Sequence, residues 1–268
     1  MDGSKHKTGS NSFKQEVNLL DKPIWKIAEH LDKRTLQTNE IIINNDNGEF
    51  IIRYNFNRTP DHTNMKIFYY LFMICQRTNS SKVSQTRYQI LANCNLSLNK
   101  DNYEKIAETA RIFTGMQIEA KNCWYSDKKY TTMIFTIMNS FDYDEKTNLV
   151  NFELNNRFLS ILAQSVFIQY INFDEYKKLK KPIAARLYEL LKTKLVANNE
   201  WRIECFKLAN KLTLDYLKYN SPAIIIRNVK IGVDEINKKT SFKIDFDIVK
   251  SEIDKKIKIV VFRVMKRI

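Results

Sequence analysis

Two triplets of residues have a spacing that could support catalysis: Asp142-Tyr143-Asp144 and Asp245-Phe246-Asp247. Alternate side chains of an extended segment lie on the same side, so each carboxylate pair could hold a divalent metal ion, as in primases and polymerases. The same alternation describes the end of a β-ribbon, with the aspartates outward and the aromatic ring inward. We favour the ribbon, because a polymerase needs a third carboxylate and a basic triphosphate site, and the sequence identifies neither. We therefore expect no catalytic residue, no metal site and no cofactor.

Other catalytic signatures are missing from the sequence. There is no G-x-x-x-x-G-K-[ST] phosphate loop, and the chain holds only five glycines, so ATP hydrolysis is not expected. Nicking replication enzymes combine a tyrosine nucleophile with a two-histidine metal cluster, which scattered histidines cannot form from neighbouring residues. We expect the three histidines at the surface: His6, His30 and His62. Four cysteines lie far apart without C-x-x-C spacing, which argues against zinc: Cys75, Cys94, Cys123 and Cys205.

A different chemistry is suggested by a helix expected at residues 222–238. Arg227 and Lys230 lie three residues apart and share its outer face with Ala223. An arginine can contact guanine through two hydrogen bonds, and a lysine can contact a second base or a phosphate. Ser221 is expected to cap this helix, where the amides of the helix start could also hold a phosphate. The alternative is that Arg227 and Lys230 belong only to a solvated helix face.

These side chains must be positioned by a structural unit that the sequence contains twice. Each copy has the order helix, helix-turn-helix and strand hairpin, which describes a winged helix. In the first copy we expect helices at residues 64–77, 84–95 and 99–114, with Ser84 as a cap, and strands at 116–124, 130–138 and 148–154. In the second copy we expect helices from residue 182, at 204–212 and at 221–238, and strands at 201–203, 241–247 and 257–264.

The N-terminal part adds further elements to the first unit. Residues 1–16 are rich in Gly, Ser, Asn and Lys and are expected to be disordered. A helix is expected at residues 23–31, and Asn47-Gly48 predicts a hairpin across residues 41–52. The predicted fold class is therefore α+β, with two tandem winged-helix domains related by internal duplication and an N-terminal helix and hairpin. The predicted domains are residues 17–157 and 158–268.

The net charge of +14 is unevenly divided between the two units. Residues 174–268 contain 23 Lys+Arg against 12 Asp+Glu, a balance of +11, whereas residues 61–157 contain 12 against 10, a balance of +2. A lysine-rich coding bias could explain part of this excess, but its concentration in one of two similar units favours a polyanion such as double-stranded DNA. The chain has no apolar run of about 20 residues and no signal peptide at its polar N-terminus, so we expect a cytoplasmic protein without a membrane partner.

Further basic residues are candidates for phosphate contacts. In the second unit they lie near or on the predicted wing: Lys238, Lys239, Lys255, Lys256 and Lys258. In the first unit they lie on the outer face of the third helix: Lys100, Lys105 and Arg111. Glu104 and Glu108 share that face and would meet phosphates at close range. The first unit is therefore expected to bind DNA weakly, or to use this surface for protein contacts.

Two segments resemble the replication initiator proteins of iteron-bearing plasmids. Residues 186–192 read R-L-Y-E-L-L-K, as in a helix of that family, and the run from residue 217 ends in Glu235-Ile236-Asn237, similar to the end of the family's recognition helix. The resemblance is specific over residues 173–264, looser over 65–154, and does not cover the first 60 residues. One departure is Gly232 inside the predicted third helix, where it could permit close packing or mark a bend.

The resemblance implies a non-enzymatic initiator that binds direct repeats at a plasmid origin. It also implies recruitment of host helicase and initiator proteins, a homodimer or a monomer–dimer exchange, and repression of the initiator's own gene. Two alternatives remain open at this point. One is a winged-helix transcription regulator without a role in replication, and the other is a primase or nicking enzyme.

Overall fold

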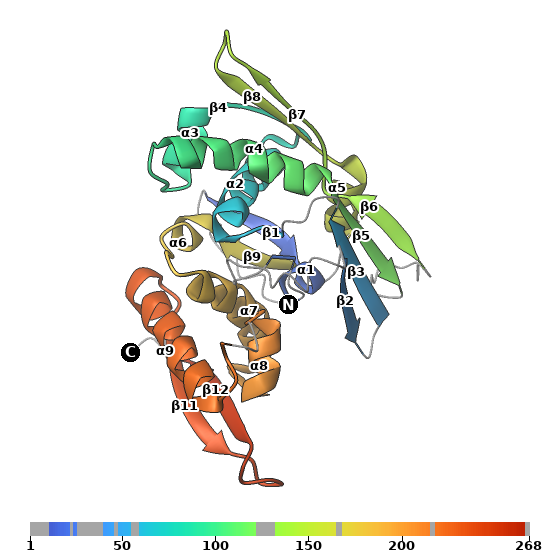
Figure 1. The fold of residues 1–268 in the computed structure, drawn as a ribbon. Helices are drawn as coiled ribbons and strands as arrows, with labels where there is room; N and C mark the ends of the chain where they lie inside the picture. Colours follow the sequence, from blue (N-terminus) through green and yellow to red (C-terminus); the bar gives the residue numbers. More distant parts are fainter. Residues whose placement is uncertain are drawn as a thin grey trace, which may run out of the picture.

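The structure is a computed structural model that describes residues 11–21, 24–25, 40–45, 48–54, 59–121, 132–164, 168–214 and 218–265 (Figure 1). Within these residues it contains two winged-helix units, one above the other in Figure 1, with a separate four-stranded sheet beside the upper unit. No helix in this part of the chain is long and apolar enough to cross a membrane.

The first winged helix consists of α2 (His62–Thr78), β4 (Lys82–Thr86), α3 (Arg87–Asn93), α4 (Lys100–Thr114), β7 (Met138–Asp144) and β8 (Leu149–Leu154). Helix α2 is buried on nearly all sides, as its apolar sequence predicts, and begins with a capping box between Asp61 and Asn64. Asn99 caps α4, whose apolar side chains pack on the core. The three expected helices are therefore confirmed.

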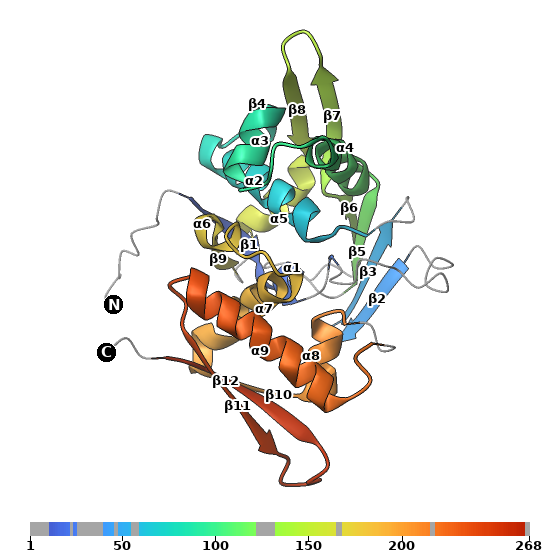
Figure 2. The ribbon, with the colours of Figure 1, turned by 60° about the vertical axis from the view of Figure 1, so that its left-hand side comes forward.

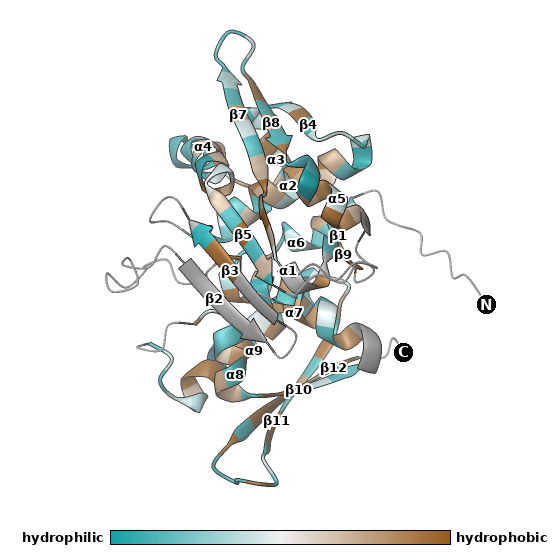
Figure 3. Ribbon diagram, turned by 90° about the vertical axis from the view of Figure 1, so that its right-hand side faces the viewer, coloured by the Kyte–Doolittle hydropathy of each residue, from teal (hydrophilic) through white to brown (hydrophobic). Residues whose placement is uncertain are grey.

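The second winged helix repeats this order of elements. It consists of α7 (Pro182–Asn198), β10 (Glu200–Glu204), α8 (Cys205–Lys211), α9 (Pro222–Lys239), β11 (Ile244–Lys250) and β12 (Lys258–Val264). The two sheets also have the same topology, β4-β8-β7 and β10-β12-β11, because in each unit the strand before the second helix pairs with the last strand of the wing. The fold thus confirms the predicted internal duplication. Brown and teal bands mark the mixed hydropathy of β11 in Figure 3, but of its apolar side chains Ile244 is buried, Phe246 is half-buried and Ile248 is exposed.

The separate sheet corrects one part of the prediction. It consists of β2 (Glu40–Asn45), β3 (Gly48–Tyr54), β5 (Met116–Lys121) and β6 (Met133–Thr136), in the order β2-β3-β5-β6. The expected hairpin around Asn47-Gly48 is present as β2 and β3, with Asp46 and Asn47 outside the described residues. The strands expected directly after α4 were assigned to the first wing, which is wrong: the wing is β7–β8. Apolar alternation identifies a strand but not its partner, which explains the error.

The N-terminal segment is also more ordered than predicted. Residues 12–16 form strand β1 (Ser12–Glu16), antiparallel to β9 (Ile168–Asn172), and Phe13 is buried against Tyr69 with ring centroids 4.8 Å apart. The predicted disorder of this segment is therefore wrong for residues 12–16. Helix α1 (Val17–Asp21) follows, whereas the helix predicted at residues 23–31 lies outside the described residues apart from Ile24 and Trp25. Strand β1 thus lies beside the segment that joins the two units (Figure 2).

Two local predictions also differ from the structure. Ser84 lies inside β4 and does not cap a helix, because the capping box of α3 is formed by Thr86 and Gln89. His62 was expected at the surface but is 6% exposed, between the rings of Trp25 and Tyr176. Burial next to Lys66 lowers the pKa of His62 to about 3, so the imidazole is neutral at pH 7.

A buried ion pair on α7 joins the two winged helices. Arg186 Nη1 donates to Glu189 Oε2 at 2.9 Å, and both side chains are 1% exposed. Glu189 also accepts hydrogen bonds from Trp25 Nε1 and from Tyr69 Oη at 3.0 Å each, and Tyr69 belongs to α2 of the first unit. Arg186 donates further hydrogen bonds to three backbone carbonyls: those of Leu20, Asp21 and Lys211. The conformations of α1, α2, α7 and the end of α8 are therefore coupled through one charged pair.

This network generates a stability prediction. Arg186→Met should lower the free energy of unfolding by about 3–5 kcal/mol, because it leaves a buried carboxylate without its cation. Urea denaturation followed by circular dichroism measures the loss. The control is Lys194→Met, which removes a half-buried ion pair with Asp21 but leaves Asp21 its second partner Lys211, and should change stability by about 1 kcal/mol or less. Equal losses in the two variants would contradict the role assigned to Arg186.

Candidate nucleic-acid interface

The exposed face of α9 is the main candidate for a DNA-reading surface. Its buried face contains the four residues predicted to point inward, Ile225, Val229, Val233 and Ile236, together with Gly232 and Glu235. The opposite face exposes Ala223, Arg227, Lys230 and Lys238 along the length of the helix, and we call these four residues the α9 stripe; the exposed carboxylate of Asp234 lies between the last two. Within the described part of the chain, Arg227, Lys230 and Lys238 form no hydrogen bond or ion pair through their side chains. Their charges therefore remain available to a ligand.

Glu235 fixes the position of α9 against the linker that precedes α7. Its carboxylate accepts hydrogen bonds from the backbone amides of Lys180 at 2.9 Å and Lys181 at 3.0 Å, and from Lys239 Nζ at 2.6 Å. Burial alone would raise the pKa of Glu235, but these donors outweigh it and lower that pKa. Lys239 was predicted to contact phosphate. In the structure its Nζ is bound to Glu235 and also donates a hydrogen bond to the carbonyl of Lys178 at 3.0 Å.

Asn237 connects α9 to the wing. Its side-chain amide donates to the carbonyl of Ile244 at 2.8 Å and accepts from the amide of Ile244 at 2.7 Å, so both backbone groups at the first residue of β11 are bound. Glu175 provides a second connection to the segment that precedes the wing. It accepts hydrogen bonds from the amide of Ser241 at 2.7 Å and from Tyr188 Oη at 2.8 Å. The wing and the α9 stripe are therefore held in a fixed relative position.

Gly232 lies where α9 packs on α7. A Cβ at this position would lie 3.5 Å from Leu187 Cδ2 and 3.6 Å from the backbone of Ala184, which is ordinary van der Waals contact, so this packing does not require a glycine. Helix α9 is continuous from Pro222 to Lys239, so Gly232 does not mark a break in the helix either.

The start of α9 agrees in part with the prediction for Ser221. Ser221 occupies the N-cap position with an extended backbone, and Pro222 follows inside the first turn. The serine side chain, however, makes no capping hydrogen bond. Its predicted contact with a phosphate remains a prediction.

The wing of the second unit carries exposed lysines around its tip. Lys255, Lys256 and Lys258 are exposed and form no side-chain hydrogen bond or ion pair with other described residues. The turn itself is ordered: the amide of Ser251 donates to the carbonyl of Ile257 at 2.9 Å, and Asp254 Oδ1 accepts from the amide of Lys256 at 2.9 Å. The tip therefore presents three lysines, beside the exposed carboxylates of Glu252 and Asp254, from a defined turn.

The basic residues of α4 in the first unit are mostly committed to ion pairs. Lys105 Nζ lies 2.7 Å from Asp61 Oδ2 and 2.9 Å from Glu108 Oε1, and Lys100 Nζ lies 3.8 Å from Glu104 Oε1. Arg111 is exposed and has no such partner among the described residues. The face of α4 thus has less uncompensated positive charge than the α9 stripe.

The aspartate triplets have the geometry of ribbon ends. Tyr143 and Phe246 pack against the core, while the four aspartates are exposed, and Asp245 Oδ2 lies 3.6 Å from Arg263 Nη1. No three Asp, Glu, His or Cys side chains form a metal-binding group within the described ranges.

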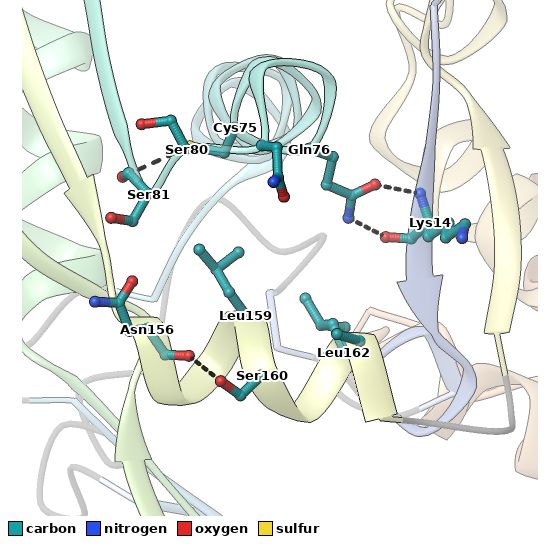
Figure 4. A pocket seen from close by; sticks show the side chains of 11 residues that line it. Lys14, Cys75, Gln76, Ser80, Ser81, Asn156, Leu159, Ser160 and Leu162 are labelled. Atoms are coloured by element: carbon teal, nitrogen blue, oxygen red, sulfur yellow. Dashed lines mark hydrogen bonds between the residues drawn. The ribbon is translucent and has the colours of Figure 1, made fainter.

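A hollow of about 580 Å³ lies between α2 and α5 (Asn156–Gln164) (Figure 4). Its lining contains Ser80, Ser81, Asn156 and Ser160, and Lys14 is the one charged residue among those that line it. Gln76 exchanges two hydrogen bonds with the backbone of Lys14, at 2.7 and 2.8 Å, beside the hollow.

Two winged helices, one with exposed basic residues on its third helix, define a tandem winged-helix architecture of the DNA-binding class. The chain belongs to the replication initiator protein A family, whose model matches residues 66–220. This membership confirms the resemblance to replication initiators.

Solved structures of initiators share the fold. The crystal structure of the Pi initiator protein in complex with iteron DNA has a TM-score of 0.57 and 15% identity, covering 77% of this chain and 92% of that chain. A structure of domains 2 and 3 of RctB has a TM-score of 0.54 and 10% identity, covering 84% of this chain and 90% of that chain. No curated protein sequence matches the chain.

The contacts of Asn237 generate a second stability prediction. Asn237→Ala leaves the amide and the carbonyl of Ile244 without their partners and should lower the free energy of unfolding by about 2 kcal/mol. Asn228→Ala is the control, because Asn228 bonds only to the carbonyl of Ile224 in its own helix. That variant should remain within about 0.5 kcal/mol of the wild type. If thermal unfolding gives the same midpoint for both, Asn237 does not hold the wing.

Proposed function

We propose that this protein is a non-enzymatic initiator of plasmid replication that binds direct repeats at an origin in a sequence-specific manner. The observation that carries the proposal is the α9 stripe, in which Arg227 and Lys230 have no side-chain partner among the described residues, on a helix that a winged helix presents to the major groove. Membership in the replication initiator protein A family supports the biological setting. The solved complex of the Pi initiator protein with iteron DNA supports direct repeats as the target.

In this proposal the second unit is the principal reader. Arg227 contacts a guanine edge, and Lys230 contacts an adjacent base or a phosphate. The wing lysines and Lys238 neutralise phosphates, and the amides at the start of α9 with Ser221 bind another. The first unit contributes weaker contacts through Lys100 and Arg111 or supplies a protein surface.

Finer features of the proposed role follow from the family. They are recruitment of host helicase and initiator proteins, exchange between monomer and homodimer, and repression of the initiator's own gene. A transcription regulator is the second candidate, because a winged helix that reads DNA suits either role. The two candidates differ in the arrangement of their binding sites.

Footprinting on the DNA that flanks the protein's own gene separates these candidates. The proposal predicts several protected segments at regular spacing, because each copy of a repeat binds one protein. A single protected palindrome would support the regulator instead. Absence of any protected segment would contradict both.

Single substitutions test which residues of the second unit read bases and which contact phosphates. Arg227→Ala should weaken binding to the protected sequence by about 1–3 kcal/mol and reduce discrimination against other sequences. Lys255→Ala should weaken binding to all sequences about equally, because a phosphate contact carries no base information. Fluorescence anisotropy with specific and scrambled duplexes measures both. If Arg227→Ala retained full discrimination while Lys105→Ala lost it, α4 and not α9 would be the main reader.

A further inference from the structure

The linker between α6 (Phe173–Tyr176) and α7 is a basic segment that lies outside the recognition helix and the wing. Four of its five residues are lysines, Lys177, Lys178, Lys180 and Lys181, and the fifth, Leu179, is fully buried. Lys177 pairs with Asp174 at 2.7 Å. The other three lysines are exposed, and within the described residues none of their ammonium groups forms a hydrogen bond or ion pair. We call Lys178, Lys180 and Lys181 the linker lysines.

The backbone of this linker is fixed at several points. Glu235 of α9 binds the amides of Lys180 and Lys181, and Lys239 of α9 binds the carbonyl of Lys178. The amide of Lys178 donates to the carbonyl of Glu175 at 3.1 Å. With Leu179 anchored in the core, the linker lysines project from a rigid turn, so little backbone ordering is needed for them to bind a ligand.

The linker lies next to the end of the α9 stripe. The hydrogen bonds of Glu235 and Lys239 place the linker at the C-terminal end of α9. Lys238, the last residue of the α9 stripe, lies at the same end. Figures 1 and 2, which differ by a 60° rotation, both show α6 between α9 and the α3–α4 pair. A duplex lying along α9 and continuing toward the first unit would therefore pass the linker.

Two acidic groups beside the linker are paired with lysines, and the third, Glu175, is buried and accepts hydrogen bonds from the amide of Ser241 and from Tyr188 Oη. Asp174 is paired with Lys177, and Glu235 is paired with Lys239. Lys66 of α2 adds a further ammonium group nearby: burial lowers its pKa to about 8, and the charges of Lys239 and Lys180 contribute to this shift. The positive charge of the linker lysines is therefore uncompensated, which favours a polyanion.

We propose that Lys178, Lys180 and Lys181 bind backbone phosphates of the duplex beside the groove occupied by α9, on the side that faces the first winged helix. This inference rests on the proposed function, since it places the linker on the same DNA. The contacts are sequence-independent, because ammonium groups on a fixed turn meet phosphates and not base edges. They extend the footprint of the second unit toward the first without requiring α4 to enter a groove.

The test replaces the three linker lysines together. For Lys178→Gln/Lys180→Gln/Lys181→Gln, the slope of log Kobs against log[salt] should fall by about 2.7, because each phosphate contact contributes about 0.9. Affinity should drop by the same factor on the protected and on a scrambled duplex of equal length. Hydroxyl-radical footprinting should show loss of backbone protection on one side of the α9 contact only.

The control is Lys14→Gln/Lys82→Gln/Lys121→Gln, which makes the same change in net charge on β1, β4 and β5 and should leave the slope unchanged. Equal slopes for the two triple variants would overturn the inference. So would loss of binding to the protected duplex with full retention on the scrambled one, because that result assigns base reading to the linker. The salt dependence on the scrambled duplex tests the linker lysines separately from the proposed function. If the wild-type protein showed no preference for the protected sequence, the proposed function would be overturned, but the comparison of the two slopes would still test the lysines.

Discussion

The buried pair of Arg186 and Glu189 is the interaction on which the arrangement of the two winged helices depends. An ion pair with side chains 1% exposed is stable only if hydrogen bonds satisfy its remaining polar atoms, and here the satisfying groups come from other elements. Trp25 and the carbonyls near α1 come from the N-terminal segment, and Tyr69 comes from α2 of the first unit. A rotation of one unit against the other would leave charged atoms unpaired in the core. The R-L-Y-E-L-L-K segment is therefore explained as a joint between units rather than as a DNA contact.

Polar side chains also fix the elements that carry the α9 stripe and the wing. Glu235 binds α9 to the linker, Asn237 binds α9 to β11, and Glu175 binds α6 to the start of the wing. Each of these polar side chains contacts the backbone of another segment, and none belongs to the α9 stripe. The recognition surface is thus built from two kinds of residue: buried polar groups that set geometry, and exposed basic groups without internal partners. In the proposed mode of DNA binding, Glu235 and Asn237 would position α9 and the wing through internal hydrogen bonds.

Much of the fold could be predicted from the sequence, because helix periodicity and caps are local properties. The order of elements, the buried face of α9 and the Asn47-Gly48 hairpin are examples. Strand pairing depends on residues that are far apart in the sequence. This explains why β5 was assigned to the wing and why residues 12–16, which pair with β9, were not predicted as a strand. The site shows the same limit: exposure of Arg227 followed from spacing, whereas the ion pair of Lys105 with Asp61 and the hydrogen bond of Lys239 to the carbonyl of Lys178 depend on residues that the fold brings near. The lysine run of the linker was visible in the sequence, but only the fold places it beside α9.

The central claim is that Arg227 of α9 reads a guanine while the rest of the molecule positions it. Methylation interference on the duplex protected by the full-length protein tests this claim most directly, because a methyl group at guanine N7 blocks the major-groove contact of an arginine. The account predicts at least one guanine whose methylation prevents binding of the wild type and has no further effect on Arg227→Ala. An interference pattern that is identical for the wild type and Arg227→Ala would contradict it.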